Sequence, residues 1–212
     1  MDKTLLKANL KKFYNQEAAL RDSKFVRADW KARIRESFHD LIQAEGKKTL
    51  LELGPGAGYD SLFFQERGLG VTAVDISGEM VKTCREKGIE AYELDFYELS
   101  SLNKKYDCIY ALNTLLHVPK ADLPHVLREI DSALEAGGLF YLGLYGGEDT
   151  ETEYVLSGVS DTPRFFAFYS ACSLRAIIKN HFQILHFETL SVKTPGNVDT
   201  FHSVVLGKKT HI

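Results

Sequence analysis

The sequence predicts an α/β fold in which a doubly wound, mainly parallel sheet follows an N-terminal helical segment. From Thr49 onward, short apolar runs alternate with stretches of helical periodicity. The segment before Thr49 has helical periodicity, and the end of the chain has two apolar runs around a turn sequence. Parallel strands joined by helical crossovers form such a sheet, and an antiparallel C-terminal pair is expected to complete it.

Composition limits the class of protein. The 212 residues are 44% hydrophobic and 26% charged, which is typical of a globular chain with a full core. The net charge of −3 does not favour nucleic-acid binding. The longest apolar stretch, near Leu139–Tyr145, is shorter than the roughly 20 residues that cross a bilayer. Because the first residues also lack an apolar signal core, a cytoplasmic protein without membrane association is expected.

Neither the cysteines nor the histidines have the spacing of a metal site. The three cysteines, Cys84, Cys108 and Cys172, are widely spaced, which fits a reducing compartment. His117 and His125 are separated by a segment with two prolines, so they do not form a helical pair. No metal is therefore expected.

Residues 1–46 are expected to form a helical cover on a main domain of residues 47–212. A shorter first helix would carry Leu6, Leu10 and Tyr14, and Gly46 has the position of a glycine that ends the second helix. Apolar residues of the second helix recur every four positions and so share one face, which predicts that Trp30 lies in the core. These residues are Val26, Trp30, Ile34, Phe38 and Ile42.

A basic face accompanies this apolar face. Arg27, Lys31 and Arg35 repeat at the same interval, and residues 1–35 hold ten Lys or Arg against four Asp or Glu. Such a face is expected to be solvated or to pair with the acidic remainder of the chain. Binding of RNA or of a protein through this helix stays open as an alternative, which the salt dependence of RNA binding would test.

The alternation after Thr49 predicts each element in turn. The expected strands are Thr49–Leu53, Val71–Asp75, Ile89–Leu94, Tyr106–Leu112 and Leu139–Tyr145. The expected crossover helices are Asp60–Arg67, Gly78–Lys87 and Asp122–Leu134. Ser77 is expected to cap the second of these helices, and Gly137-Gly138 to end the third.

The C-terminal part departs from this alternation. Residues 146–162 are polar and Gly-rich, and are expected to form a long loop. A short strand at Arg164–Tyr169 and a helix at Ser170–Asn180 should follow. Phe182–Val192 and Thr200–Gly207 flank Thr194-Pro195-Gly196-Asn197, which predicts an antiparallel pair joined by a turn.

A glycine loop lies between the first strand and the next helix, in the run Glu52-Leu53-Gly54-Pro55-Gly56-Ala57-Gly58. Glycines let the backbone turn sharply and approach a ligand. The spacing is Gly-x-Gly-x-Gly, whereas dinucleotide-binding loops have Gly-x-Gly-x-x-Gly and P-loops end in Gly-Lys-Ser/Thr. The carboxylate of Glu52 beside the loop would repel a pyrophosphate and attract a cation.

Acidic residues end the next two strands. Asp75 ends the second strand, where a carboxylate can accept hydrogen bonds from both hydroxyls of a ribose. Asp95 and Phe96 follow the third strand and offer a carboxylate for an adenine amino group and an aromatic face beside its ring. Ligands bind at the carboxyl ends of such strands, so these residues should lie together.

With these motifs the chain resembles the class I S-adenosylmethionine (SAM) dependent methyltransferases, in particular the small-molecule enzymes of the ubiquinone/menaquinone-biosynthesis-like and tellurite-resistance-like group. The resemblance is strong over residues 49–145. It implies a first motif of Glu52, Gly54, Gly56 and Gly58, and Asp75 as the ribose-binding acid. It further implies that these residues contact the adenine or pass under the methionine part of SAM: Ile76, Met80, Asp95, Phe96, Ala111, Leu112 and Asn113.

The resemblance implies a Rossmann-like, seven-stranded sheet of order 3-2-1-4-5-7-6 with strand seven antiparallel. It also implies in-line methyl transfer from SAM, which becomes S-adenosylhomocysteine, to an O, N or S atom of a small organic acceptor. The chain has Asn113-Thr114-Leu115-Leu116 where amino-methylating DNA and protein enzymes carry Asn-Pro-Pro-Tyr. An RNA or protein methyltransferase and a non-catalytic SAM-binding regulatory protein remain alternatives.

The catalytic residues are the hardest to predict, because methyl transfer depends more on positioning than on acid or base catalysis. His117, after the fourth strand, is the best candidate for a base, although a role in capping or bracing the loop before Pro119 is favoured over catalysis. Tyr14 is a candidate to reach the methyl group if the N-terminal helices form a lid rather than pack on the back of the sheet. Further candidates for the acceptor pocket are Tyr145, Arg164, Tyr169 and His202.

Overall fold

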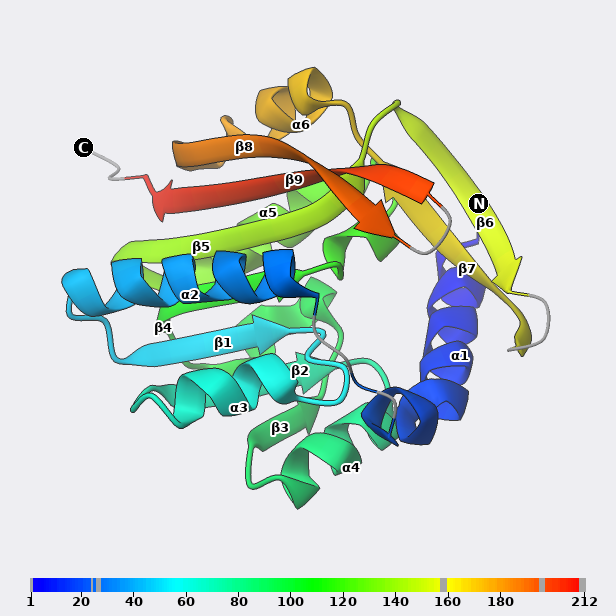
Figure 1. The fold of residues 1–212 in the computed structure, drawn as a ribbon, viewed down its shortest axis with the longest axis horizontal. Coiled ribbons are helices and arrows are strands. Elements are labelled where there is room, and N and C mark those ends of the chain that lie inside the picture. The colour runs from blue at the N-terminus through cyan, green and yellow to red at the C-terminus, as the bar shows by residue number, and fades with distance from the viewer. Residues whose placement is uncertain (1, 24, 26–27, 157–159, 195–196, 210–212) are drawn as a thin grey trace.

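A computed structural model describes residues 2–23, 25, 28–156, 160–194 and 197–209 (Figure 1). Within these residues, seven strands form one sheet in the order β3-β2-β1-β4-β5-β9-β8. The strands are β1 (Thr49–Leu53), β2 (Gly70–Asp75), β3 (Glu90–Glu93), β4 (Tyr106–Leu112), β5 (Leu134–Gly146), β8 (Phe182–Thr194) and β9 (Asn197–Lys208).

The strand order confirms the predicted topology. The first five strands pair in parallel, and β9 lies antiparallel between β5 and β8. Since β8 and β9 are the sixth and seventh strands of this sheet along the chain, the order is 3-2-1-4-5-7-6. β1 pairs with β2 on one side and with β4 on the other, so the direction of winding reverses beside β1. Ligands bind at this reversal in open α/β sheets.

Helices cover both faces of the sheet (Figure 1). On one face α2 (Asp29–Ala44) and α3 (Tyr59–Gln65) bury aromatic and aliphatic side chains against β1, β4 and β5. On the same side α4 (Gly78–Glu86) packs on β2 and β3 through Val81 and Cys84. Ser77 caps α4 as predicted, because its hydroxyl accepts a hydrogen bond from Met80 N at 3.2 Å.

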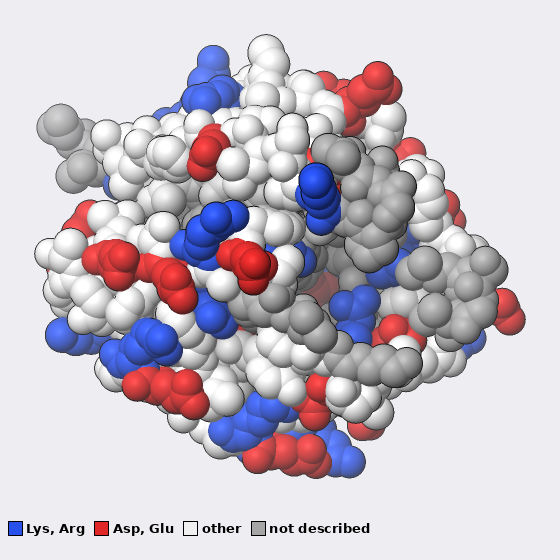
Figure 2. All heavy atoms as spheres, viewed as in Figure 1, with Lys and Arg blue, Asp and Glu red and all other residues white. Residues whose placement is uncertain are grey.

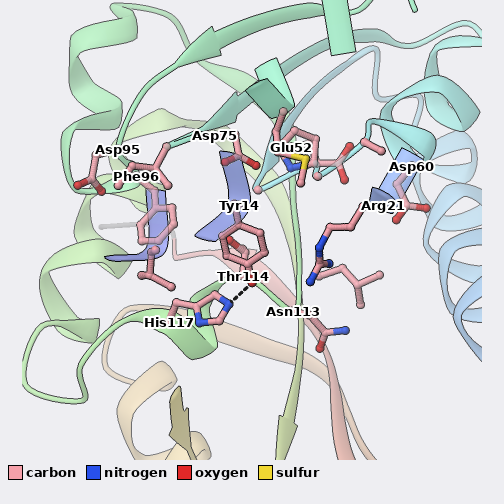
Figure 3. A pocket seen from close by; sticks show the side chains of 18 of the residues that line it. Tyr14, Arg21, Glu52, Asp60, Asp75, Asp95, Phe96, Asn113, Thr114 and His117 are labelled. Carbon is pink, nitrogen blue, oxygen red and sulfur yellow. Dashed lines mark hydrogen bonds between the residues drawn. The ribbon is translucent and has the colours of Figure 1, made fainter. Parts of the chain in front are cut away.

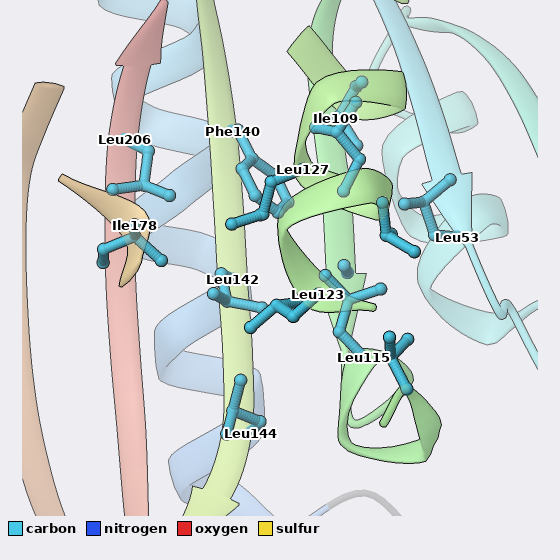
Figure 4. Close-up of a cluster of buried hydrophobic side chains, with 14 of the residues drawn as sticks. Leu53, Ile109, Leu115, Leu123, Leu127, Phe140, Leu142, Leu144, Ile178 and Leu206 are labelled. Atoms are coloured by element: carbon cyan, nitrogen blue, oxygen red, sulfur yellow. The ribbon is translucent and has the colours of Figure 1, made fainter. Parts of the chain in front are cut away.

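The opposite face carries the largest hydrophobic cluster. Here α5 (Leu123–Ala133) and α6 (Ala171–Ile178) pack on the sheet, and Figure 4 shows Leu123 and Leu127 of α5 against Phe140 and Leu142 of β5. Each fully buried aliphatic or aromatic side chain contributes roughly 1.5–3 kcal/mol to stability. This core holds the strand ends, and therefore the loops after them, in fixed positions.

α1 (Lys3–Ser23) lies beyond the carboxyl ends of the parallel strands, beside the antiparallel pair β6 (Thr150–Leu156) and β7 (Ser160–Phe168) (Figure 1). Its buried face consists of Leu6, Leu10, Phe13 and Ala18. The N-terminal segment therefore divides: α2 covers the sheet, whereas α1 covers the strand ends.

Ion pairs join α1 to the rim of the strand ends. Lys3 Nζ lies 2.5 Å from Asp122 Oδ1, and Lys7 Nζ lies 2.6 Å from Asp95 Oδ2. Lys11 pairs with Glu93 at the end of β3. The Ser77 hydroxyl, next to α4, donates to Asn15 Oδ1 at 2.7 Å. The lysines of α1 thus form ion pairs with residues at the ends of several different elements.

The structure corrects two expectations about the N-terminal helices. The first helix is the longer, with 21 residues against 16, because its apolar face continues beyond Tyr14 to Ala18. Trp30 is only half-buried and packs edge-to-face on Phe201 at a ring distance of 4.7 Å. Phe38 and Ile42 of the same face are buried as expected, whereas Val26 and Arg27 lie outside the described residues.

Two expectations after residue 133 are also wrong. The segment 146–162 is not a long loop, since it contains β6 and the start of β7. The alternating Thr and Glu residues at the start of β6 had suggested a loop, because polar side chains are exposed on this strand. α5 ends at Ala133, before Gly137-Gly138, which lie inside β5. A Cβ on Gly138 would lie 2.9 Å from Glu135 O, so glycine at this position allows the backbone to bend tightly.

The C-terminal elements follow the sequence prediction. α6 begins after Ser170, whose hydroxyl accepts from Ser173 N at 3.2 Å, and the β8–β9 pair has the expected antiparallel register. The turn residues Pro195 and Gly196 lie outside the described residues. Among the helices of the described residues, none is both long enough and apolar enough to cross a bilayer.

Salt is expected to loosen α1 selectively. The Lys3–Asp122 and Lys7–Asp95 pairs are partly exposed, and raising salt from about 0.01 M to about 1 M shortens the Debye length from about 30 Å to about 3 Å. Amide hydrogen exchange in α1 should therefore accelerate with salt, while exchange in α2, held by Phe38 and Ile42, should not. Equal responses of the two helices would contradict this account.

Candidate functional site

A cavity of about 520 Å³ opens between the carboxyl ends of β1, β2 and β4 and the buried side of α1 (Figure 3). Its volume is within the range of small-molecule and cofactor sites. Its wall includes these residues that the sequence singled out: Tyr14, Glu52, Gly54, Gly56, Asp75, Ile76, Met80, Asp95, Phe96, Leu112, Asn113 and His117.

The glycine loop forms one wall of the cavity. Gly54 has φ +64°, and a Cβ there would lie 2.3 Å from Thr114 Oγ1, so only glycine lets the loop pass the segment after β4. At Gly56, which lines the cavity, a Cβ would meet nothing within 4 Å. The backbone of the loop is therefore presented directly to a ligand.

Two predicted residues lie outside the cavity wall. Gly58 has φ +82°, and a Cβ there would approach Ile89 Cδ1 to 2.8 Å and Cys84 Sγ to 2.9 Å. Its role in the structure is to pack the loop against α4. Ala111 is fully buried within β4 and belongs to the hydrophobic core. Both positions shape the site without contributing to its surface.

Glu52 and Asn113 supply polar atoms beside the loop. The Glu52 carboxylate is buried and accepts a hydrogen bond from the Ser61 hydroxyl. Asn113 adopts a left-handed backbone with φ 55°, and its N–H donates to Gly143 O at 2.7 Å. Its side-chain Oδ1 is buried in the cavity wall and has no hydrogen-bond partner among the described residues. A buried acceptor of this kind favours a donor on a ligand.

Asp75 is a buried carboxylate at the end of β2 (Figure 3). It accepts a hydrogen bond from Ser77 N at 2.9 Å. Burial raises the pKa of Asp75 to about 6, although the backbone hydrogen bonds and the charge of Arg21 act in the opposite direction. A carboxylate buried at this cost, with its oxygens near the cavity, is the type of group that positions ligand hydroxyls.

Asp95 and Phe96 begin the 3₁₀ helix η1 (Phe96–Leu102) after β3. Asp95 accepts a hydrogen bond from Tyr97 N at 3.1 Å and pairs with Lys7 of α1. Lys7 Nζ also lies 3.7 Å from the centre of the Tyr97 ring, a cation–π distance. The far end of the cavity from Tyr14 is therefore closed by contacts between α1 and η1.

Tyr14 and His117 meet across the cavity wall, with Tyr14 Oη 2.6 Å from His117 Nε2 (Figure 3). His117 Nδ1 lies 2.7 Å from the Phe165 carbonyl oxygen, which can only accept. Nδ1 therefore carries the proton, and Nε2 accepts the hydrogen bond that the Tyr14 hydroxyl donates. The structure brings together the two residues that the sequence marked as catalytic candidates.

Burial keeps both members of this pair in their neutral forms. Burial, with smaller contributions from the charges of Arg164 and Arg21, lowers the pKa of His117 to about 4 against the raising effect of the Phe165 carbonyl. Burial also raises the pKa of Tyr14, while the charges of Arg21 and Arg164 and a hydrogen-bonding approach by Arg164 lower it. At neutral pH His117 is an acceptor of one hydrogen bond rather than a cation.

The other residues suggested for the acceptor pocket do not reach the cavity wall within the described part of the chain. Tyr145 packs on Trp30 and Phe201. His202 Nε2 lies 2.9 Å from the Tyr169 carbonyl oxygen, so both belong to the packing between β9 and the end of β7. Arg164 is buried beside Tyr14.

Several wall residues escaped the sequence interpretation. The side of α1 that faces the cavity includes Arg21, which lies seven positions after Tyr14, or two helical turns along the same face. Extending the Leu6, Leu10, Tyr14 periodicity would have reached it. Thr114 follows Asn113 and Tyr59 follows Gly58, but no motif in the sequence marked either of them as a site residue. Others in the wall are Lys3, Lys7, Leu20, Phe25, Lys31, Pro55, Ala57, Asp60, Tyr97 and Pro119.

The charged residues outside the cavity form no cluster of one sign on the face in Figure 2, where Lys and Arg alternate with Asp and Glu. Arg35 of the predicted basic face pairs with Asp60 at 3.1 Å, and its guanidinium lies over the Phe63 ring. Among the described residues, no group of three or more His, Cys, Asp or Glu is placed to hold a metal ion.

Comparisons with known proteins identify the same part of the chain. Residues 50–138 match a family model described as a methyltransferase domain. The chain is 30% identical over 136 residues to the malonyl-[acyl-carrier protein] O-methyltransferase of Hamiltonella defensa subsp. Acyrthosiphon pisum (strain 5AT), a match that covers 61% of this chain and 52% of that protein. The chain therefore spans about half the length of this relative.

A second relative matches over more of the chain. The ubiquinone biosynthesis O-methyltransferase of Aeromonas salmonicida (strain A449) is 25% identical over 209 residues, covering 88% of this chain and 84% of that protein. Among solved structures, 1,6-didemethyltoxoflavin-N1-methyltransferase of Burkholderia thailandensis superposes with a TM-score of 0.70 at 18% identity. The match covers 98% of this chain and 88% of that one, whose crystal structure contains 1,6-didemethyltoxoflavin and S-adenosylhomocysteine.

The match to a solved structure at 18% identity shows a similar fold. The family model, in contrast, matches the amino-acid sequence of residues 50–138. The residues that match the family model include most of β1, the glycine loop after it, β2 and β4. Residues 50–138 therefore match a methyltransferase domain in sequence, and the resemblance of this chain to the class I SAM-dependent methyltransferases is confirmed.

Proposed function

We propose that this chain is an enzyme that transfers a methyl group from SAM to an O, N or S atom of a small organic acceptor. The observation that carries the proposal is a single cavity that joins the glycine loop, Asp75 and Asp95 to the Tyr14–His117 pair. The glycine loop, Asp75 and Asp95 fit the adenosyl part of SAM. Tyr14 and His117 line another part of the cavity wall. Two relatives are named O-methyltransferases, which favours oxygen as the methylated atom.

The wall residues fit the parts of SAM. The Asp75 carboxylate would accept hydrogen bonds from the ribose hydroxyls, and Asp95 with Phe96 would hold the adenine. Asn113 Oδ1, buried without a partner among the described residues, would accept from the methionine ammonium group. Leaving such an atom unpaired costs about 1–3 kcal/mol, so a ligand donor there is favourable. Ile76 and Met80 line the same part of the cavity.

SAM supplies a methyl group on a sulfonium, which is an excellent leaving group. The protein therefore contributes chiefly orientation and exclusion of water. α1 covers the cavity, and its Tyr14 hydroxyl is held in place by His117. With a pKa of about 4, His117 is too weak to take a proton from a hydroxyl of ordinary pKa. We assign His117 as a positioning residue for Tyr14 and place Tyr14 against the acceptor.

A small-molecule acceptor is better supported than RNA or protein. Arg35 of the α2 basic face is engaged with Asp60 within the same chain. The mixed charges of Figure 2 offer no continuous track for a phosphate backbone on that face. The cavity lies beneath α1, which limits the size of what enters. Transfer of labelled methyl to a small-molecule panel would separate an enzyme from a SAM-binding regulator.

SAM and S-adenosylhomocysteine are expected to raise the melting temperature, because both would bind the folded chain alone. At a ligand concentration about 100 times the Kd, the stabilisation is about 2.7 kcal/mol. NAD should give no shift, since the loop has Gly58 where a dinucleotide loop would need glycine at position 59. A shift with NAD and none with the adenosyl ligands would contradict the proposal.

Replacing Asp75 is expected to weaken binding of SAM while the fold is kept. Hydrogen bonds to a charged group contribute roughly 1.5–3 kcal/mol, so Asp75→Ala should lower the affinity about ten- to a hundredfold. Asp75→Asn should lose less, because one oxygen acceptor remains. Calorimetry with S-adenosylhomocysteine measures both. Unchanged affinity in Asp75→Ala would remove Asp75 from the site.

The same carboxylate is expected to destabilise the ligand-free fold. Its pKa is raised from 3.8 to about 6, so the folded chain binds more protons than the unfolded chain between these values, and stability falls as pH rises through this window. At pH 7 the cost is about 3 kcal/mol. Asp75→Asn should therefore resist denaturant better at pH 7. The control Asp107→Asn should be less stable, because hydrogen bonds from Lys48 and Thr49 lower the pKa of Asp107.

Bound S-adenosylhomocysteine is expected to protect α1, since Leu10 and Tyr14 line the cavity that it would fill. Hydrogen exchange around Leu10–Ala18 should slow when the ligand is added. Tyr14→Phe should reduce kcat with little effect on the Kd for S-adenosylhomocysteine. Protection confined to residues 52–60, 75–80 and 95–96 would mean that α1 is structural and that Tyr14 is not a site residue.

A further inference from the structure

The cavity extends beyond the residues that fit the adenosyl part of SAM. Figure 3 shows Asp95 at one side, Asp75 nearer the middle, and Arg21 with Glu52 toward the other side, and all four line the cavity. SAM is a linear molecule in which adenine, ribose, sulfur and a free amino-acid end follow one another. With the adenine beside Asp95 and the ribose beside Asp75, the amino-acid end would extend to the side of Arg21.

Arg21 brings a positive charge to this part of the wall from the last turn of α1. Its guanidinium lies 5.0 Å from the centre of the Tyr14 ring, a cation–π distance that holds it toward the cavity. Its Nε lies 4.0 Å from Glu17 Oε2, which is too long for a hydrogen bond. Glu17 therefore leaves the N–H donors of Arg21 available to a ligand.

The other basic residues of the described cavity wall are engaged elsewhere. Lys3 and Lys7 form ion pairs of 2.5 and 2.6 Å with acidic residues, and Lys7 reaches the adenine end through Asp95. Lys31 Nζ lies 5.8 Å from the ring centre of Tyr145, which is outside the described wall. Arg21 is the basic residue best placed to meet the far end of SAM.

The charges at this end of the cavity match a zwitterion. The amino-acid end of SAM carries an ammonium and a carboxylate. The buried Oδ1 of Asn113, which has no hydrogen-bond partner among the described residues, and the carboxylate of Glu52 suit the ammonium. A guanidinium suits the carboxylate, because it presents several N–H donors in a plane. A wall with charges of both signs complements such a group better than it complements an ion of one sign.

We propose that Arg21 binds the carboxylate at the amino-acid end of SAM and of S-adenosylhomocysteine, and thereby ties α1 to the bound cofactor. This inference rests on the proposed function and adds to it a cofactor-binding residue outside residues 50–138. Methyl transfer leaves the carboxylate unchanged, so the same contact serves the cofactor before the reaction and its product afterwards.

The contact has a consequence for the cover formed by α1. A ligand held by Arg21 on one side and by Asn113 on the other connects α1 to the loop after β4 across the cavity. A compound that fills the adenosyl part but lacks the carboxylate would leave this connection unmade. The amino-acid end would therefore contribute both to affinity and to the closed position of α1.

The test is calorimetric titration with S-adenosylhomocysteine and with its decarboxylated form, which keeps the ammonium and lacks only the carboxylate. A hydrogen-bonded ion pair of this type changes affinity by about ten- to a hundredfold. We expect the unaltered protein to bind S-adenosylhomocysteine more tightly than the decarboxylated form by that factor.

Arg21→Met should remove this preference. Methionine keeps a long apolar stem and is a good helix former, so α1 should persist. Affinity for S-adenosylhomocysteine should fall about ten- to a hundredfold, while affinity for the decarboxylated form should stay nearly unchanged. Arg21→Lys, which keeps the charge, should retain part of the preference. The matched control is Lys12→Met, which removes one charge from the exposed side of the same helix and should change neither affinity.

Hydrogen exchange gives a second measurement. S-adenosylhomocysteine should slow exchange around Leu10–Ala18 more than the decarboxylated form does at equal saturation. In Arg21→Met the two ligands should protect α1 equally, while both still protect residues 75–80. A structural role of Arg21 alone would not make protection of α1 depend on the carboxylate of the ligand.

Equal affinity of the unaltered protein for the two ligands would overturn the inference and leave the proposed function intact. An equal loss of both affinities in Arg21→Met would also overturn it, because Arg21 would then act on the fold of the site. The comparison in the unaltered protein decides the outcome even if Arg21→Met does not fold. If neither ligand binds the unaltered protein, the proposed function fails and the inference fails with it.

Discussion

The hydrogen bond between Tyr14 and His117 joins three parts of the chain that are far apart in sequence. Tyr14 belongs to α1, His117 follows β4, and the Phe165 carbonyl of β7 fixes the histidine from its other side. Because Nδ1 must donate to that carbonyl, the tautomer of His117 is determined, and with it the direction in which the Tyr14 hydroxyl points. This connection ties α1, the loop after β4 and β7 to one another at the cavity wall.

The cavity wall contains groups that are poorly satisfied in the chain by itself. Asp75 is buried as a carboxylate, and Asn113 Oδ1 has no hydrogen-bond partner among the described residues. Each lowers the stability of the fold, and the hydrophobic layers on both faces of the sheet compensate. A ligand with hydroxyls and an ammonium group in the matching positions would satisfy both. The places where the chain is least stable are therefore informative about what it binds.

The sequence predicted the cofactor half of the site better than the acceptor half, for a physical reason. Gly54, Gly56, Asp75 and Asp95 each follow a strand at once, so the parallel sheet alone brings them together. Arg164 meets Tyr14 only because β7 pairs with β6 and packs on α1, and the alternating polar residues of β6 had suggested a loop. Gly58 and Ala111 lie outside the cavity wall, because motif positions that pack the loop or the core look the same in sequence as positions that face a ligand.

The placement of α1 and β7 has a consequence for how such a protein diverges during evolution. Asp75, Asp95 and Asn113 lie inside the segment 50–138 that matches the family, whereas Tyr14, Arg21 and Arg164 lie outside it. The two ends of one cavity are thus encoded by separable stretches of the gene. Mutations in α1 can change one end of the cavity while the residues that match the family model stay the same. The two ends of the cavity are therefore free to diverge at different rates.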